Sequence, residues 1–169
     1  MPSQTARSVK GLSHKAACNP CLARIIISYC SRKLDDRGRH DTSKMGKRLT
    51  DRGVEPDSLV SSPALRALTT AQLIADEIGY QRKHISVDER LYASSPDNVL
   101  AVIRTLDDGL DRVMLFGHDP EFTELVHWLS STIIDMPTCA VAEFRFDATA
   151  WADVAEIDPA KVRMDTPRE

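Results

Sequence analysis

The chain has 169 residues and a formal net charge of −3, from 22 Lys and Arg against 25 Asp and Glu. Its hydrophobic share of 42% and charged share of 28% are ordinary for one globular domain. This charge balance argues against a nucleic-acid partner, and no apolar run approaches the roughly 20 residues that span a bilayer. No apolar stretch follows the N-terminal basic residues, so we expect no secretory signal and no membrane contact. We expect the protein to be cytoplasmic.

Residues 1–21 show no hydrophobic periodicity and are predicted to form a poorly ordered or aberrant N-terminal arm. The arm contains the C-x-x-C pair Cys18 and Cys21, with His14 before it and Cys30 after it. These four residues are of the types that bind zinc, and the pair alone also suggests a redox interaction protein. The flanking residues are typical of a loop, so the favoured interpretation is reduced thiols without metal, and we predict no cofactor.

The first regular element is predicted at residues 22–29, where three consecutive isoleucines are typical of a buried strand. A polar connector follows over residues 32–38. Residues 41–52 then predict a helix, with Met45 and Leu49 facing the core.

A second strand is predicted to end at Ser61 and to lead directly into a helix that continues to about Ile78. Either Ser61 or Ser62 is a suitable N-cap, and Pro63 suits the first helical turn. Arg66 then lies one turn inside the helix, at the carboxyl end of the strand, where a guanidinium can hold an anion. An arginine in such a turn is, taken alone, more often an ordinary surface residue.

The second half of the chain predicts the same alternation. A short strand over residues 84–87 precedes a helix over residues 95–106, and a strand ending at Gly117 precedes a helix ending at Ser130. Residues 139–146 alternate with a period of two, which indicates an edge strand or a strand buried on one side.

Together these elements predict an α/β fold: a three-layer sandwich with a mostly parallel sheet, one antiparallel strand and helices on both faces. The domain is expected to cover residues 22–157, and residues 158–169 are expected to form a frayed tail. His118 follows the strand that ends at Gly117. If that strand is the parallel neighbour of the strand before Arg66, both side chains face one cleft as donors for a phosphoryl group.

Four segments between residues 32 and 147 form an ordered set of motifs: RKLDDRGR at residues 32–39, SSPALRA at 61–67, DERLY at 88–92 and GHDP at 117–120. With these motifs the chain resembles the histidine phosphatases, also called the phosphoglycerate mutase-like superfamily. Within that superfamily it is most similar to the small bacterial phosphohistidine phosphatases.

The resemblance implies a metal-independent phosphatase that transfers a phosphoryl group to a histidine nitrogen and then to water. Arg66 matches the phosphate-binding arginine of the family, His118 matches the second site histidine, and Arg32 is a further phosphate contact. The implied substrate is a phosphohistidine protein, such as a histidine phosphotransfer domain, or a small phosphorylated molecule, and the implied state is a monomer. Asp88 or Glu89 is the nearest candidate for a general acid, although a solvated turn is the favoured interpretation.

The family begins with a strand followed by Arg-His, whose histidine is the nucleophile, and no Arg-His pair precedes residue 39 here. In one placement, residues 8–12 are the first strand and His14 is the nucleophile, with Ser13 in place of the arginine. This placement predicts a phosphohistidine phosphatase-like hydrolase.

In the other placement, residues 22–28 are the first strand, and Ser28 and Tyr29 occupy the motif positions. The chain then lacks the nucleophile, and the alternative function is a catalytically impaired module that binds phosphate or phosphoproteins. A frameshift or a misassigned start would also explain why the resemblance fades before residue 32.

Overall fold

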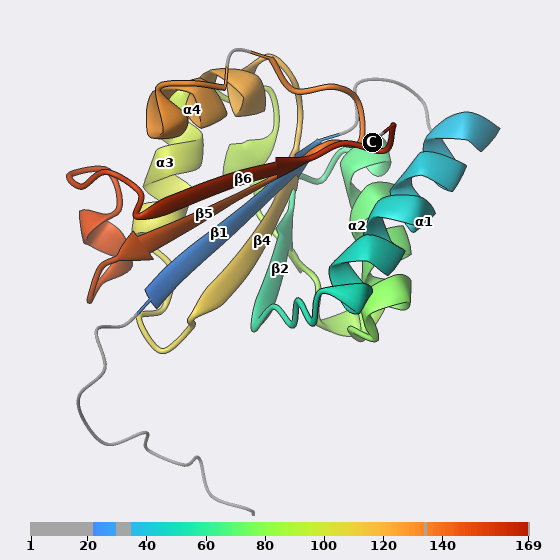
Figure 1. Ribbon diagram of the computed structural model, residues 1–169, viewed down its shortest axis with the longest axis horizontal. Coiled ribbons are helices and arrows are strands. Elements are labelled where there is room, and N and C mark those ends of the chain that lie inside the picture. The colour runs from blue at the N-terminus through green and yellow to red at the C-terminus, as the bar shows by residue number, and fades with distance from the viewer. Residues whose placement is uncertain (1–21, 30–34, 134, 169) are drawn as a thin grey trace, which may run out of the picture.

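The computed structural model describes residues 22–29, 35–133 and 135–168. The regular elements of these ranges are β1 (Leu22–Tyr29), α1 (Asp36–Asp51), β2 (Ser58–Ser61), α2 (Leu65–Ile78), β3 (Ser86–Val87), α3 (Pro96–Arg104), β4 (Arg112–Gly117), α4 (Glu121–Ser130), β5 (Val141–Asp147) and β6 (Lys161–Asp165). The strands form one sheet in the order β3-β2-β4-β1-β5-β6 (Figure 1).

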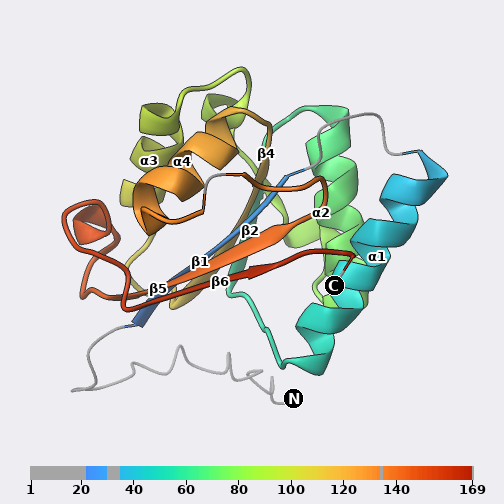
Figure 2. The ribbon, with the colours of Figure 1, turned by 45° about the horizontal axis from the view of Figure 1, so that its top comes forward.

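Helices cover both faces of this sheet, as the alternation of elements predicts. Helices α1 and α2 pack on one face, and α3 and α4 pack on the other (Figure 2). Strands β2, β3 and β4 pair in parallel, β4 also pairs in parallel with β1, and β5 runs antiparallel to both β1 and β6. The predicted three-layer α/β sandwich with one antiparallel strand is therefore confirmed.

Strand β1 lies between β4 and β5, and its three isoleucines are completely buried. Side chains alternate across a strand, so Ile26 faces α1 and α2 while Ile25 and Ile27 face α3 and α4. This central position explains the uninterrupted apolar run, because both sides of β1 are core. The alternative first strand at residues 8–12 lies outside the described residues.

Strand β5 is buried on one side, as its period of two predicts, but it is not an edge strand. Ala142, Phe144 and Phe146 belong to the core beneath α3 and α4, while Glu143 and Arg145 face the other way and remain partly exposed. The edge position beyond β5 is taken by β6.

The prediction that residues 158–169 form a frayed tail is wrong. Lys161–Asp165 is β6 and pairs antiparallel with β5. Val162 and Met164 pack against the core on one side of β6, and Arg48 of α1 donates to the carbonyl of Thr166 over 2.6 Å. The strand was missed because it has only two inward apolar side chains, Val162 and Met164, and charged residues alternate with them.

The helices before and after β2 in the chain both begin at other residues than predicted. Helix α1 begins at Asp36, because the Asp35 carboxylate accepts a hydrogen bond from the Gly38 N–H (2.7 Å) and caps a polar first turn. Helix α2 begins at Leu65 rather than at Pro63, and it has no side-chain cap. Its end is as predicted, with Gly79 in the left-handed conformation (φ 73°).

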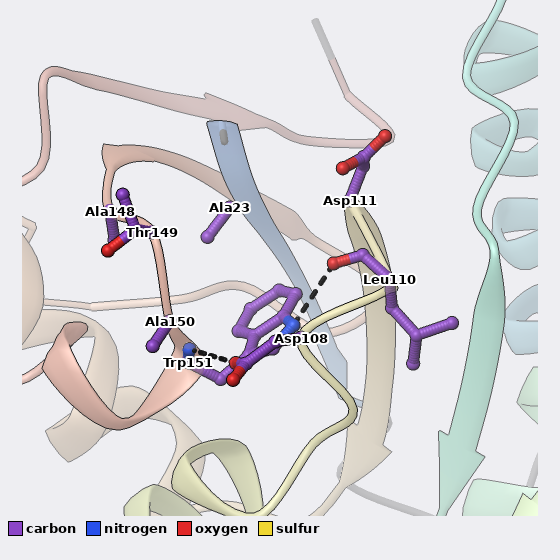
Figure 3. Close-up of a pocket in the computed structure, with 8 residues that line it drawn as sticks. All are labelled: Ala23, Asp108, Leu110, Asp111, Ala148, Thr149, Ala150 and Trp151. Atoms are coloured by element: carbon purple, nitrogen blue, oxygen red, sulfur yellow. Dashed lines mark hydrogen bonds between the residues drawn. The ribbon is translucent and has the colours of Figure 1, made fainter. Parts of the chain in front are cut away.

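Trp151 is buried at the end of the core where strands β1 and β4 begin. Its indole N–H donates to the carbonyl of Leu110 over 3.0 Å, and its backbone N–H donates to the Asp108 carboxylate over 2.8 Å (Figure 3). The space beside the ring is about 10 Å³, room for at most one water molecule. This depression is therefore a packing feature and holds no ligand-sized space.

Across the described ranges, no helix has the length and apolarity needed to cross a membrane.

Candidate functional site

Arg66 and His118 are in direct contact. The Arg66 Nε–H donates to Nδ1 of His118 over 2.9 Å, and Nε2 of the same ring lies 2.9 Å from the Ser62 hydroxyl. The three residues come together because β2 and β4 are parallel neighbours, with Ser61 opposite Phe116. The residues that follow these two strands therefore lie at the same edge of the sheet, as predicted.

Gly117 and Phe122 set the backbone that carries His118. A Cβ atom at position 117 would lie 2.4 Å from the Phe122 ring, so only glycine allows the ring to pack against the end of β4. The Phe122 N–H in turn donates to the His118 carbonyl over 3.1 Å. The His118 side chain is held in a buried position, 5% exposed.

The contact with Arg66 determines which ring nitrogen of His118 carries the proton. A guanidinium is always protonated and can only donate, so Nδ1 must be the acceptor. In the neutral ring the proton then lies on Nε2, which donates to the Ser62 hydroxyl. Burial of the ring, together with the positive charge of Arg66, lowers the pKa of His118 below its ordinary value of 6.5. The imidazole is therefore neutral at pH 7.

This arrangement argues against Ser62 as a nucleophile activated by His118. A histidine acting as general base needs its lone pair on the nitrogen that faces the serine, and an acceptor such as a carboxylate at the other nitrogen. Here Arg66 places a donor at that other nitrogen. The Ser62 oxygen also accepts from the Ala64 N–H (3.3 Å), so Ser62 serves as an acceptor that orients the ring.

Two neighbours of His118 were not singled out from the sequence. Ser62 was considered only as a helix cap, although it immediately follows the end of β2 at the same sheet edge. Tyr92 places its ring edge-on to the imidazole, with ring centroids 6.2 Å apart, and remains 59% exposed. Its position in the DERLY segment was the available signal.

Asp88 is engaged by Arg90 and faces the turn rather than His118. Its carboxylate accepts from the Arg90 backbone N–H (2.9 Å) and pairs with the guanidinium at 2.7 Å. The hydrogen bond from the Arg90 side chain holds the pKa of Asp88 below its ordinary value. A carboxyl kept ionised in this way cannot supply a proton near neutral pH, and Glu89 is exposed. These contacts favour the turn interpretation.

The carboxyl end of β1 reaches the same level of the sheet as His118, since Tyr29 lies opposite Gly117. Tyr29 is buried with the core beneath α3 and α4, and Ser28 is buried between Phe116 and Val141 of the flanking strands. Neither described residue at this end of β1 is a histidine.

The remaining predicted residues fall elsewhere. His14 and Arg32 lie outside the described residues, as do Cys18, Cys21 and Cys30 of the possible zinc set. The only Arg-His pair of the chain, at positions 39 and 40, is exposed on α1. Within the described ranges, no three His, Cys, Asp or Glu side chains are grouped closely enough to hold a metal ion.

Solved structures with the same fold include phosphatases and a mutase. The protein histidine phosphatase SixA complexed with tungstate superposes with a TM-score of 0.72 at 20% identity, over 86% of this chain and 97% of that one. The phosphoglycerate mutase from Plasmodium falciparum gives 0.62 at 14% identity, over 84% and 89%. Mycobacterial glucosyl-3-phosphoglycerate phosphatase in complex with VO3 gives 0.59 at 16% identity, over 85% and 98%. The chain therefore has the phosphoglycerate mutase-like fold.

Part of the sequence also matches a known protein family. Residues 23–92 match the model of the histidine phosphatase superfamily, branch 1. The mitochondrial serine/threonine-protein phosphatase Pgam5 of Drosophila persimilis is 36% identical over 52 residues, which are 31% of this chain and 18% of that protein. The same protein of Drosophila pseudoobscura pseudoobscura matches equally. The match thus spans less than a fifth of the length of these curated relatives.

Proposed function

We propose that this protein binds phosphoryl groups at Arg66 and His118, in the manner of a phosphohistidine phosphatase. The proposed ligands are phosphohistidine proteins, such as histidine phosphotransfer domains, or small phosphoesters. The observation that carries the proposal is the 2.9 Å contact between the Arg66 guanidinium and the His118 ring at the carboxyl ends of two parallel strands. Structures with the same fold hold tungstate or VO3, two oxyanions that resemble phosphate, which supports this class of ligand.

The charge at the site favours an anion. Among the described residues, no carboxylate pairs with Arg66, and its only hydrogen-bond acceptor is the neutral His118 ring. A phosphoryl oxygen beside Arg66 is a better acceptor than an imidazole nitrogen, because the bond is then charge-assisted on both sides. Such an anion also stabilises protonated His118, so that Nδ1–H becomes a second donor. Each charge-assisted bond contributes about 1.5–3 kcal/mol.

Hydrolysis needs more than binding, because an in-line nucleophile must attack the phosphorus. Ser62 faces a donor nitrogen, and Ser28 and Tyr29 are buried in the sheet core. The described residues therefore favour a phosphoryl-binding module. Turnover would depend on His14, the candidate from the first placement, and hydrolysis through His14 is the second candidate function.

Binding and turnover can be separated with one substrate. A histidine phosphotransfer domain, phosphorylated with radiolabelled phosphate, is mixed with the protein, and complex formation and release of label are both measured. We expect binding of the phosphorylated domain, about tenfold or more weaker in Arg66→Ala through loss of a charge-assisted contact. Arg82→Ala removes an exposed arginine paired with Asp76 and is the matched control. Equal binding by wild type and Arg66→Ala would exclude this site.

A further inference from the structure

A second cationic site lies at the opposite end of the same strands. On the sheet face that carries α1 and α2, a hollow of about 200 Å³ is lined by six cationic side chains: Arg24, Arg52, Arg112, Arg145, Lys161 and Arg163. Glu143 is the one carboxylate in its lining. Arg24 and Arg112 each lie five residues before the ends of β1 and β4, about 16 Å from the Arg66–His118 level at the rise of a strand.

Four of these cations form a continuous row across the sheet. Lys161 of β6 lies opposite Arg145 of β5, which lies opposite Arg24 of β1, which lies opposite Arg112 of β4. Residues directly opposite in a sheet have Cβ atoms about 5 Å apart, and like charges in such pairs destabilise it. The fold therefore holds four positive charges together at a cost in stability.

The nearby carboxylates already have partners other than the guanidinium groups of the row. Arg52, after the end of α1, pairs with both Glu143 and Asp165. Arg163 donates to the second oxygen of Asp165 through two bonds of 3.2 Å. On the far side, the Asp57 carboxylate accepts from the backbone N–H of Arg112 (2.9 Å) rather than from its guanidinium.

The arginines of the row have few hydrogen-bond acceptors or ion-pair partners. Within the described ranges Arg24 and Arg112 have no ion pair, and Arg145 has one long contact, 3.6 Å, to the exposed Asp147. The Nε atoms of Arg112 and Arg145 are buried without a hydrogen-bond acceptor, which is costly for a charged group. Burial, and then repulsion from Arg24, lower the pKa of Arg112, while Glu143, Asp57 and Glu55 act in the other direction.

The N-terminal sequence of the chain does not supply the missing negative charge. Residues 1–21 contain Arg7, Lys10 and Lys15 but no Asp or Glu. The volume of the hollow is also below the roughly 300–1,000 Å³ of pockets for drug-sized ligands. A compact anion with several charges fits both the volume and the number of donors.

We propose that this hollow is a second anion-binding site, for a small polyphosphate such as pyrophosphate, separate from the Arg66–His118 site. The unpaired guanidinium groups of Arg24 and Arg112 are its principal ligands, and the more exposed Lys161 is a peripheral one. An anion there supplies acceptors to the buried Nε groups and screens the repulsion along the row. The proposal does not depend on the phosphatase-like function.

The test uses the Arg66→Ala protein, so that only the second site remains, and pyrophosphate as the probe. Calorimetry and thermal unfolding are compared with and without Arg24→Gln and Arg112→Gln. We expect saturable binding of one pyrophosphate, weakened about tenfold or more by the two substitutions. Without ligand, the same substitutions should raise the melting temperature, since they remove repulsion between opposite residues. This paired result distinguishes loss of a site from loss of the fold.

Further variants keep the proposal open to refutation if the double variant folds poorly. Lys161→Gln changes an exposed residue of β6 and should weaken pyrophosphate binding less than the double variant, with a smaller salt dependence than the parent. Arg82→Gln, at an exposed residue that pairs with Asp76 and does not line the hollow, should leave the affinity unchanged. Equal pyrophosphate affinity in the parent, the double variant and Lys161→Gln would overturn the proposal. Binding of a hexa-aspartate peptide without any binding of pyrophosphate would also overturn it, in favour of a peptide site.

Discussion

Arg66 donates to Nδ1 of His118 over 2.9 Å, and this bond leaves the imidazole proton on Nε2. The candidate site therefore combines one fixed positive charge, on Arg66, with one neutral ring, that of His118. It differs from a serine–histidine pair, in which the outer nitrogen donates to a carboxylate.

The first prediction concerns the tautomer and the pKa of His118. Nitrogen NMR of the free protein at pH 7.5 should show Nε2 protonated and Nδ1 unprotonated. In Arg66→Ala the pKa of His118 should rise, because the adjacent positive charge is gone, although the burial that lowers it remains. A free protein with its proton on Nδ1 would contradict the hydrogen-bond assignment.

The second prediction is a pH dependence with opposite signs for stability and for binding. The folded pKa of His118 is lowered, so between that value and 6.5 the unfolded chain binds more protons than the folded one. Its contribution to the free energy of unfolding is complete above pH 6.5 and is lost as the pH falls through this window. Vanadate binding should strengthen over the same window, because the anion favours the protonated ring.

Urea unfolding and vanadate titrations at several pH values check both signs. The control is His118→Asn, which should lose both dependences. The contribution of Asp88, whose lowered pKa makes it act only below about pH 4, should remain in that variant. Vanadate binding that weakens between pH 6.5 and 5 would remove His118 from the site.

The third prediction tests Ser62. In Ser62→Ala the buried Nε2–H of His118 loses its acceptor, which should lower the free energy of unfolding by about 1–3 kcal/mol. Oxyanion binding should survive, because Arg66 remains. If Ser62→Ala instead abolished an existing turnover without affecting stability, Ser62 would be a nucleophile. Urea unfolding and vanadate calorimetry on the same preparation distinguish the outcomes.

The fourth prediction tests the backbone before His118. Gly117→Ala places a methyl group 2.4 Å from the Phe122 ring, and such overpacking should cost about 1–3 kcal/mol of unfolding free energy. Vanadate affinity should fall as well, since the residue after it carries the imidazole. Adding Phe122→Leu makes room for the methyl group, so the double variant should lose less stability than the sum of the single variants. Simple additivity would exclude this contact as the cause.

The sequence predicted most of the framework, because long apolar patterns report burial directly. The burial of the β1 isoleucines and of Met45 and Leu49 of α1 was available from the apolar pattern. The adjacency of β2 and β4 was inferred from the expectation that Arg66 and His118 share one cleft. The placement of Arg66 and His118 at one edge of the sheet followed from the direction of parallel strands, whereas their direct hydrogen bond was not predicted.

What escaped the sequence depends on contacts between distant residues. Strand β6 has two inward side chains among charged ones, so its identity comes from pairing with β5. Ser62 resembles a helix cap, and only the approach of His118, 56 positions away, gives it a different partner. The row from Lys161 to Arg112 becomes visible only when the register of four strands is known.

The last prediction concerns catalysis through His14. Strand β1 lies between β4 and β5 and ends level with Gly117, which favours the placement in which residues 22–28 are the first strand. In that placement Ser28 and Tyr29 stand at the motif positions, and the chain lacks the nucleophile. We therefore predict no covalent phosphohistidine at His14. After mixing with a radiolabelled phosphotransfer domain, denaturing gels and peptide mapping should find no label on the protein, and His14→Ala should change neither binding nor release of phosphate.

A variant with the motif restored provides the matched control. Label on that variant would show that the absence of label on the natural chain comes from the site and not from the assay. Ser28→Arg with Tyr29→His returns the Arg-His pair at the end of β1, where position 29 lies opposite Gly117. If this double variant folds, it should acquire label at position 29, and adding Arg66→Ala should suppress that label by removing the phosphate contact. Label on His14 of the natural chain, lost in His14→Ala together with about 10³-fold of the rate, would show instead that the chain is a phosphatase with His14 as its nucleophile.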